Sequence, residues 1–176
     1  MSSEYRGLEA QQELSKLVAQ DLYDALPDGA DEILFAVSMF VQYLQASILL
    51  YRNGEKIGSI PKAGNVTSHV RSLREAMCTP GGGTWFSAVF RVFRDGRMKS
   101  SFNYDEEPVF TDVRGRPKEV MPSLYARDFD AFPRSAKATP AWLAAKVEAG
   151  RAQIAQIEAE EQEKQARARL TAEGDR

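Results

Sequence analysis

Apolar residues recur at spacings of three and four near the start of the chain, with polar residues between them, which is typical of an amphipathic helix. The pattern predicts a helix over residues 4–26. Its expected end is Pro27-Asp28-Gly29, because proline disfavours helical geometry at the preceding residue and glycine readily takes a positive φ. The positions that share the apolar face are Leu14, Leu17, Val18, Leu22, Ala25 and Leu26.

The pattern then changes to one that favours strands. Residues 33–51 carry no charge and are rich in β-branched and aromatic side chains, which predicts strands at 32–40 and 43–52. Asn53-Gly54 is the strongest short-range signal for a hairpin turn, so a third strand is expected at 55–60.

A second helix is predicted over residues 66–77. Its apolar face consists of Val70, Leu73, Ala76 and Met77. We expect Arg71, Arg74 and Glu75 to point elsewhere.

Three glycines, residues 81–83, follow this helix and are interpreted as a flexible hinge. Strands are expected at 84–94 and 97–104, joined by the turn signal Asp95-Gly96. Residues 105–139 contain several prolines and predict a loop with helical turns around 124–132. A last helix is predicted from Pro140.

These elements predict the α+β class: an antiparallel sheet of about five strands, packed with N-terminal, central and C-terminal helices. The order of the strands is expected to follow the chain closely. Residues 1–145 are expected to form a single domain. Residues 146–176 are mostly alanine and charged residues, and they predict either a polar helix that projects into solvent or a frayed tail.

Composition narrows the function classes. The chain has 23 Lys and Arg against 25 Asp and Glu, which argues against the broad positive field of a nucleic-acid-binding protein. A single cysteine and a single histidine exclude a closed structural zinc site, and no cofactor is expected. Because no window approaches 18 uninterrupted apolar residues, no membrane span is expected, and the cytoplasm is the predicted location.

Few residues suggest catalysis. Cys78 and His69 are nine positions apart, half a turn out of alignment on one helix, so they are expected to face opposite ways. A small hydrolytic enzyme could instead use loop carboxylates together with His69; these carboxylates are Asp105, Glu106, Glu107 and Asp112.

A basic set on the second hairpin could contact phosphate or an acidic partner; it consists of Arg91, Arg94, Arg97 and Lys99. A helix-mediated scaffold is a further alternative, although Ile154, Ile157 and Leu170 are sparse for a heptad seam.

Several segments, in this order and spacing, resemble the YezG-like immunity-protein family. They are LREAM at 73–77, GTWFS at 83–87, DGR at 95–97 and FNYDEEP at 102–108. The segments YARDFDAFPR at 125–134 and PAWL at 140–143 resemble the ending of actinobacterial members. The resemblance covers about residues 10–145.

The resemblance implies an α+β antitoxin that binds a cognate polymorphic toxin domain, often a nuclease, and neutralises it without catalysis. Its most function-like segment is 103–105, where a strand with aromatic residues runs into three successive carboxylates. An aromatic anchor beside negative charge suits a protein-binding surface. The expected toxin-binding residues are Tyr104, Asp105, Glu106 and Glu107, with Asp112 as a neighbour.

Overall fold

The computed structural model describes residues 3–174, and the side chains of residues 7–167. The order of elements confirms the predicted α+β class. The helices are α1 (Ser3–Asp24), α2 (Val66–Ala76), α3 (Pro122–Ala131), the short 3₁₀ turn η1 (Ala136–Ala138) and α4 (Ala141–Gly174). The strands are β1 (Glu32–Phe40), β2 (Tyr43–Arg52), β3 (Glu55–Ile60), β4 (Ser87–Phe93) and β5 (Met98–Asn103).

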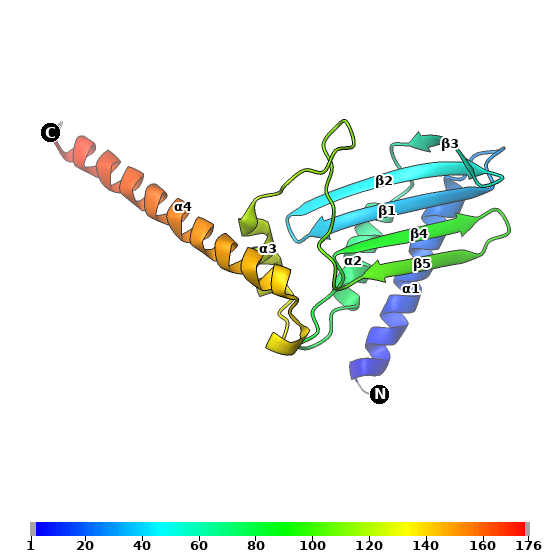
Figure 1. Ribbon diagram of the computed structural model, residues 1–176, viewed down its shortest axis with the longest axis horizontal. Coiled ribbons are helices and arrows are strands. Elements are labelled where there is room, and N and C mark those ends of the chain that lie inside the picture. Colours follow the sequence, from blue (N-terminus) through cyan, green and yellow to red (C-terminus); the bar gives the residue numbers. More distant parts are fainter. Residues whose placement is uncertain (1–2, 175–176) are drawn as a thin grey trace.

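The five strands form one antiparallel sheet in the order β3-β2-β1-β4-β5 (Figure 1). Both predicted hairpin turns are present: Asn53 and Gly54 have positive φ angles of 50° and 80°, and β4 and β5 pair antiparallel across Asp95-Gly96. The order departs from the chain at one point, since β4 pairs with β1 and not with β3. The chain reaches that position through α2, and β1 becomes the central strand.

α1 and α2 cover one face of this sheet, as Figure 1 shows. Alternate residues of β1, including Ile33, Phe35 and Val37, are buried in one core with Val70 and Leu73 of α2. The apolar face of β1, formed by every second residue, therefore packs against the apolar face of α2 in a single layer.

A second core lies beyond the ends of β1 and β4, where α3 and the first part of α4 pack. Its centre is Phe40, whose ring centroid is 4.6 Å from that of Tyr125 on α3 and 5.3 Å from that of Phe110. The buried members of this core are Phe40, Phe86, Phe110, Tyr125, Leu143 and Val147.

A buried ion pair joins the two cores, and here one prediction is wrong. Arg74, expected to point away from the core, is 2% exposed and bonds Asp128 of α3 through both terminal nitrogens, at 2.9 and 2.8 Å. Its Nε donates to the carbonyl of Trp85 at 2.7 Å. The Asp128 carboxylate also accepts the backbone N–H of Val41 at 2.8 Å. The charge is buried because it is paired and hydrogen-bonded.

The expected hinge at residues 81–83 is also wrong, because backbone hydrogen bonds fix these glycines. The N–H of Thr79 donates to the carbonyl of Gly83 at 3.0 Å, and Ser135 donates to that of Gly81 at 2.7 Å. Gly83 has a φ of +67°, and a Cβ there would lie 2.6 Å from the side chain of Arg134. These residues are a close-packed docking point for the segment before α4.

α4 is one continuous helix in the described part of the chain, and its outer part projects away from the body (Figure 1). Its packing on α3 extends past residue 145: a Cβ at Gly150 would lie 2.3 Å from the carbonyl oxygen of Pro122, and Gln153 accepts the N–H of Ser123 at 3.0 Å. Ile157 is 43% exposed, and the side chain of Leu170 lies outside the described residues. The projecting-helix alternative is therefore the one observed.

Truncation after Gln162 is expected to change the free energy of unfolding by only a few tenths of a kcal/mol, because the removed residues with described side chains, 163–167, are all exposed. Urea titration of the full and truncated chains measures this difference. A loss of several kcal/mol would contradict it and would mean that the outer helix packs on the body or on a second subunit.

Candidate functional site

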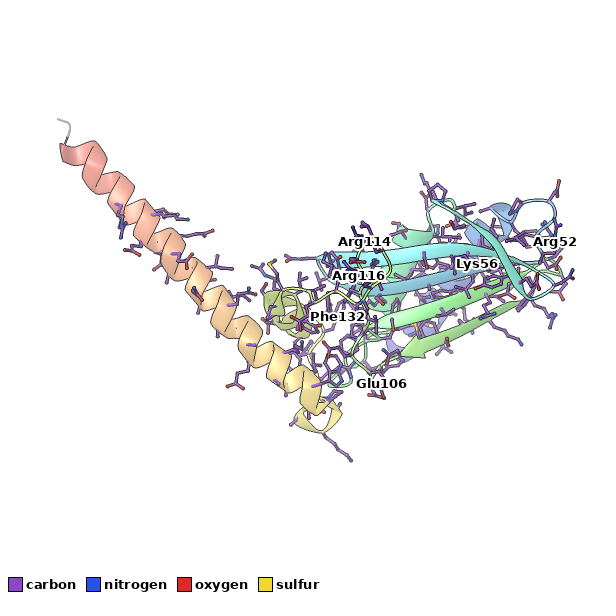
Figure 2. All side chains as sticks on the ribbon, turned by 45° about the horizontal axis from the view of Figure 1, so that its top comes forward. Arg52, Lys56, Glu106, Arg114, Arg116 and Phe132 are labelled. Carbon is purple, nitrogen blue, oxygen red and sulfur yellow. The ribbon has the colours of Figure 1, made fainter. Side chains whose placement is uncertain are left out.

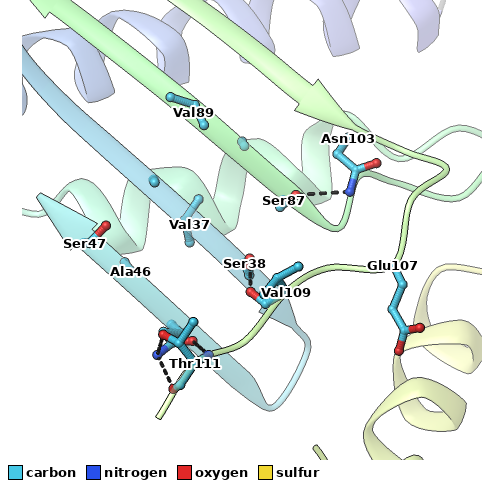
Figure 3. Close-up of a pocket in the computed structure, with 13 residues that line it drawn as sticks. Val37, Ser38, Ala46, Ser47, Ser87, Val89, Asn103, Glu107, Val109 and Thr111 are labelled. Atoms are coloured by element: carbon cyan, nitrogen blue, oxygen red, sulfur yellow. Dashed lines mark hydrogen bonds between the residues drawn. The ribbon is translucent and has the colours of Figure 1, made fainter. Parts of the chain in front are cut away.

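Residues 104–121, named here the crossing loop, traverse the face of the sheet that α1 and α2 leave uncovered (Figures 1 and 3). The loop leaves the end of β5 and is fastened to β1 where Ser38 Oγ donates to the carbonyl of Val109 at 3.2 Å. It is fastened to β2 where Gln45 Nε2 donates to the carbonyl of Thr111 at 2.8 Å and Gln45 Oε1 accepts its N–H at 2.7 Å. Side chains of the sheet thus hold an otherwise irregular segment in place.

A groove of about 410 Å³ lies between the crossing loop and the sheet (Figure 3). The wall includes Val109 and Asn103. The Nδ2 of Asn103 donates to Ser87 Oγ at 3.1 Å. Because the side chains on the floor are short, the sheet can be approached closely. They include Ala36, Ser38, Ser47, Ser87 and Val89.

The first part of the crossing loop carries the predicted acidic residues. Asn103 Oδ1 accepts the N–H groups of Asp105 and Glu106 at 3.2 and 2.8 Å, which sets the turn after β5. Asp105 and Glu106 are exposed, and Figure 2 shows Glu106 at this edge of the molecule. Tyr104 is half-buried and packs against the helix-side core. Burial raises the pKa of its hydroxyl. The two carboxylates, and not the aromatic ring, are what this segment exposes.

Glu107 is engaged with the second core. The Tyr125 hydroxyl donates to its Oε1 at 2.8 Å, and Lys146 Nζ lies 3.4 Å from the same oxygen. Burial, and next the hydrogen bond to Glu107, raise the pKa of Tyr125 well above its usual range. Glu107 therefore links the crossing loop to α3 and α4.

Asp112 is attached to a different strand from Asp105. It follows Thr111, which is fastened to β2, whereas Asp105 follows β5; the two attachments are three strand spacings apart, about 14 Å. Its Oδ2 accepts the Arg116 guanidinium, and its Oδ1 accepts backbone N–H groups. Hydrogen bonds from Arg116 lower the pKa of Asp112. The predicted neighbour therefore belongs to a separate turn.

The crossing loop also presents apolar side chains that were not predicted. Val113, Val109 and Met121 are the three most exposed large apolar side chains in the part of the chain whose side chains are described, at 103%, 65% and 58%. Isolated apolar residues in a proline-rich loop give no periodic signal. Their exposure follows from how the loop is fastened, which the sequence does not reveal.

The other sequence candidates have structural partners. His69 Nδ1 lies 2.7 Å from Asp21 of α1, on the covered side of the sheet, away from the crossing loop and its carboxylates. The half-buried Cys78 lies beyond the end of α2.

In the basic hairpin, Arg91 pairs with Glu32 at 2.7 Å and Arg97 with Asp95 at 2.7 Å. Arg94 donates to the carbonyls of Leu26, Pro27 and Ala30. These arginines thus hold the fold's own turns and strands together.

Among residues with described side chains, no group of three or more His, Cys, Asp or Glu is arranged to hold a metal ion. None of the helices in the described part of the chain has the length and apolar content needed to cross a membrane.

No protein-family model matches the chain, and no curated protein matches it.

Proposed function

We propose that this chain is a non-enzymatic immunity protein that acts in the cytoplasm, binding a cognate toxin domain and neutralising it. The observation that carries the proposal is the crossing loop, which presents exposed apolar side chains and the exposed carboxylates of Asp105 and Glu106 on a segment fastened to the sheet. Exposed apolar residues gathered on one loop favour a protein interface, and fastening lowers the entropic cost of binding. The resemblance to YezG-like immunity proteins supports the same function.

Asp105 and Glu106 suit a basic partner such as a nuclease. Both carboxylates are exposed, and Trp142 Nε1 holds the backbone beneath them by donating to the carbonyl of Asp105 at 2.6 Å. Charges at the rim of an interface mainly set association rate and its dependence on salt. Steering by this pair would speed the encounter with a positively charged toxin surface.

The enzyme alternative has less support, because its residues do not share a site. His69 pairs with Asp21 on the covered side of the sheet, Glu107 bonds Tyr125, and Asp112 is held in its own turn. A general acid and base must lie within hydrogen-bond reach of one reacting group.

Co-expression tests the proposal. A large toxin gene with a variable C-terminal domain is expected beside the gene for this chain, and that domain is expressed with and without it. We expect the chain to restore growth and, with purified proteins, toxin activity to fall to zero at one chain per toxin. Failure to restore growth would overturn the proposal, and inhibition at a small fraction of one chain per toxin would favour the enzyme.

Reversing the charge of Glu106 to lysine is expected to slow association, and to weaken its dependence on salt, without changing stability. Glu55→Lys on β3 is the matched control, because Glu55 is also exposed but lies outside the crossing loop. Stopped-flow association at several salt concentrations measures both effects. Equal rates for the two variants would place the steering charge elsewhere.

A further inference from the structure

The crossing loop contains a tight turn, residues 111–117, that is organised around one carboxylate. Asp112 Oδ1 accepts the N–H groups of Arg114 and Arg116 at 2.8 and 3.0 Å, and its Oδ2 accepts Arg116 Nε at 2.8 Å. Asp112 also donates its own N–H to the carbonyl of Arg116 at 2.9 Å, and Gly115 completes the turn with a φ of +75°. We name this segment the projecting turn.

The base of the projecting turn is fixed to the body. Gln45 holds both backbone groups of Thr111, and the N–H of Lys118 donates to the carbonyl of Phe110 at 2.8 Å. Phe110 is 2% exposed, and its ring centroid lies 5.1 Å from that of Tyr43. The turn is therefore organised before any partner binds, which reduces the ordering cost of association.

The outer end of the projecting turn presents one apolar and one charged side chain to solvent. Val113 is fully exposed. The Arg114 guanidinium is exposed and has no hydrogen bond or ion pair to another residue with a described side chain, whereas Arg116 is paired with Asp112. Figure 2 shows Arg114 and Arg116 near one another. Lys118 adds a further positive charge near the face of the Tyr43 ring. The end of the turn is thus apolar and positively charged.

We propose that the projecting turn inserts into a concave, acidic site on the toxin, with Val113 in an apolar recess and Arg114 paired with carboxylates. The inference rests on the proposed function and names the surface and partner chemistry for it. A rigid protrusion fits a concave partner, and arginine is among the residues that most often dominate binding energy. Burial of the exposed Val113 side chain in an apolar recess would add a hydrophobic contribution.

The whole loop then carries opposite charges at its two ends. Asp105 and Glu106 lie at the β5 end, and Arg114 lies at the β2 end, on attachments about 14 Å apart. A matching toxin surface would be basic opposite the first end and acidic opposite the second. Such a pattern penalises the reversed orientation and so fixes how the two proteins dock.

An anionic membrane is a poorer fit than a protein. Only one large apolar side chain stands at the tip, which is little area for insertion into lipid. The carboxylates of Asp105 and Glu106 on the same loop would be repelled by an anionic surface.

The experiment measures binding of the toxin domain defined above by surface plasmon resonance. Arg114→Ala and Val113→Ala are each expected to weaken binding by roughly tenfold or more, mainly through faster dissociation. Lys56→Ala and Ile57→Ala on β3 are the matched controls; both side chains are exposed, and both changes should leave the affinity within about twofold.

Each outcome decides the inference. If the wild-type chain does not bind the toxin domain, the proposed function fails and this inference fails with it. If the wild-type chain binds and the Arg114 and Val113 variants bind equally well, only the inference is overturned. Cosedimentation with phosphatidylglycerol vesicles that Val113→Asp abolishes would also overturn it, in favour of a membrane.

Discussion

Replacing Asp128 by alanine should destabilise the fold by about 3–5 kcal/mol, the cost of leaving one partner of a buried ion pair uncompensated. The Arg74 and Asp128 side chains are 3% and 4% exposed. Without the carboxylate, the guanidinium remains buried among the rings of Trp85 and Phe132, and the N–H of Val41 loses its acceptor. Guanidinium titration followed by far-UV circular dichroism measures the loss.

The double variant Arg74→Met/Asp128→Leu is the control for this prediction. It removes both charges together and keeps apolar volume, so we expect it to recover most of the stability that the single variant loses. A single variant that costs less than about 1 kcal/mol would show that water or a shifted side chain compensates the arginine. A double variant as unstable as the single one would show that the pair itself carries the stability.

Replacing Phe40 by alanine should cost about 3–5 kcal/mol, because a fully buried ring leaves a cavity that the second core cannot close. The ring lies between those of Phe110 and Tyr125, and Phe110 anchors the crossing loop. We therefore expect faster hydrogen exchange at the N–H of Lys118, which donates to Phe110, and at that of Thr111, which donates to Gln45, because both hydrogen bonds depend on the position of the loop.

Phe35→Ala separates the general effect from the local one. Phe35 is also buried on β1, but its ring belongs to the core on the helix side, 6.3 Å from Phe90. We expect a similar loss of stability with crossing-loop exchange unchanged at conditions where both variants are folded. Equal acceleration of loop exchange in both variants would contradict the independent anchoring of the loop.

The strands could be predicted because their signals are local. Residues 33–51 are uncharged and rich in β-branched and aromatic side chains, and Asn53-Gly54 needs only its own backbone to turn the chain. The bounds of β1, β2 and β3 and the start of α2 match the prediction, whereas the other helix and strand ends that were predicted differ by one to three residues. Pairing of β4 with β1 could not be predicted, because it depends on which way α2 carries the chain.

Long-range pairing explains the rest of what was missed. Arg74 lies on the charged side of its helix by periodicity, and only Asp128, far along the chain, makes its burial favourable. The glycines at 81–83 are fixed by residues 134 and 135. At the site, the acidic residues were predicted from local sequence, and their role in binding remains a prediction. The exposure of Val113 was not predicted, because it depends on long-range contacts such as the hydrogen bonds from Gln45 that fasten the loop to β2.

The continuous α4 makes the particle elongated. Its 34 residues span about 51 Å, and the outer part projects away from the body (Figure 1). Friction with solvent depends on length more than on mass, so a monomer of 19.6 kDa should elute from a gel-filtration column ahead of globular standards of equal mass. Early elution is therefore the expected behaviour of a single chain, and light scattering is the measurement that distinguishes it from a dimer.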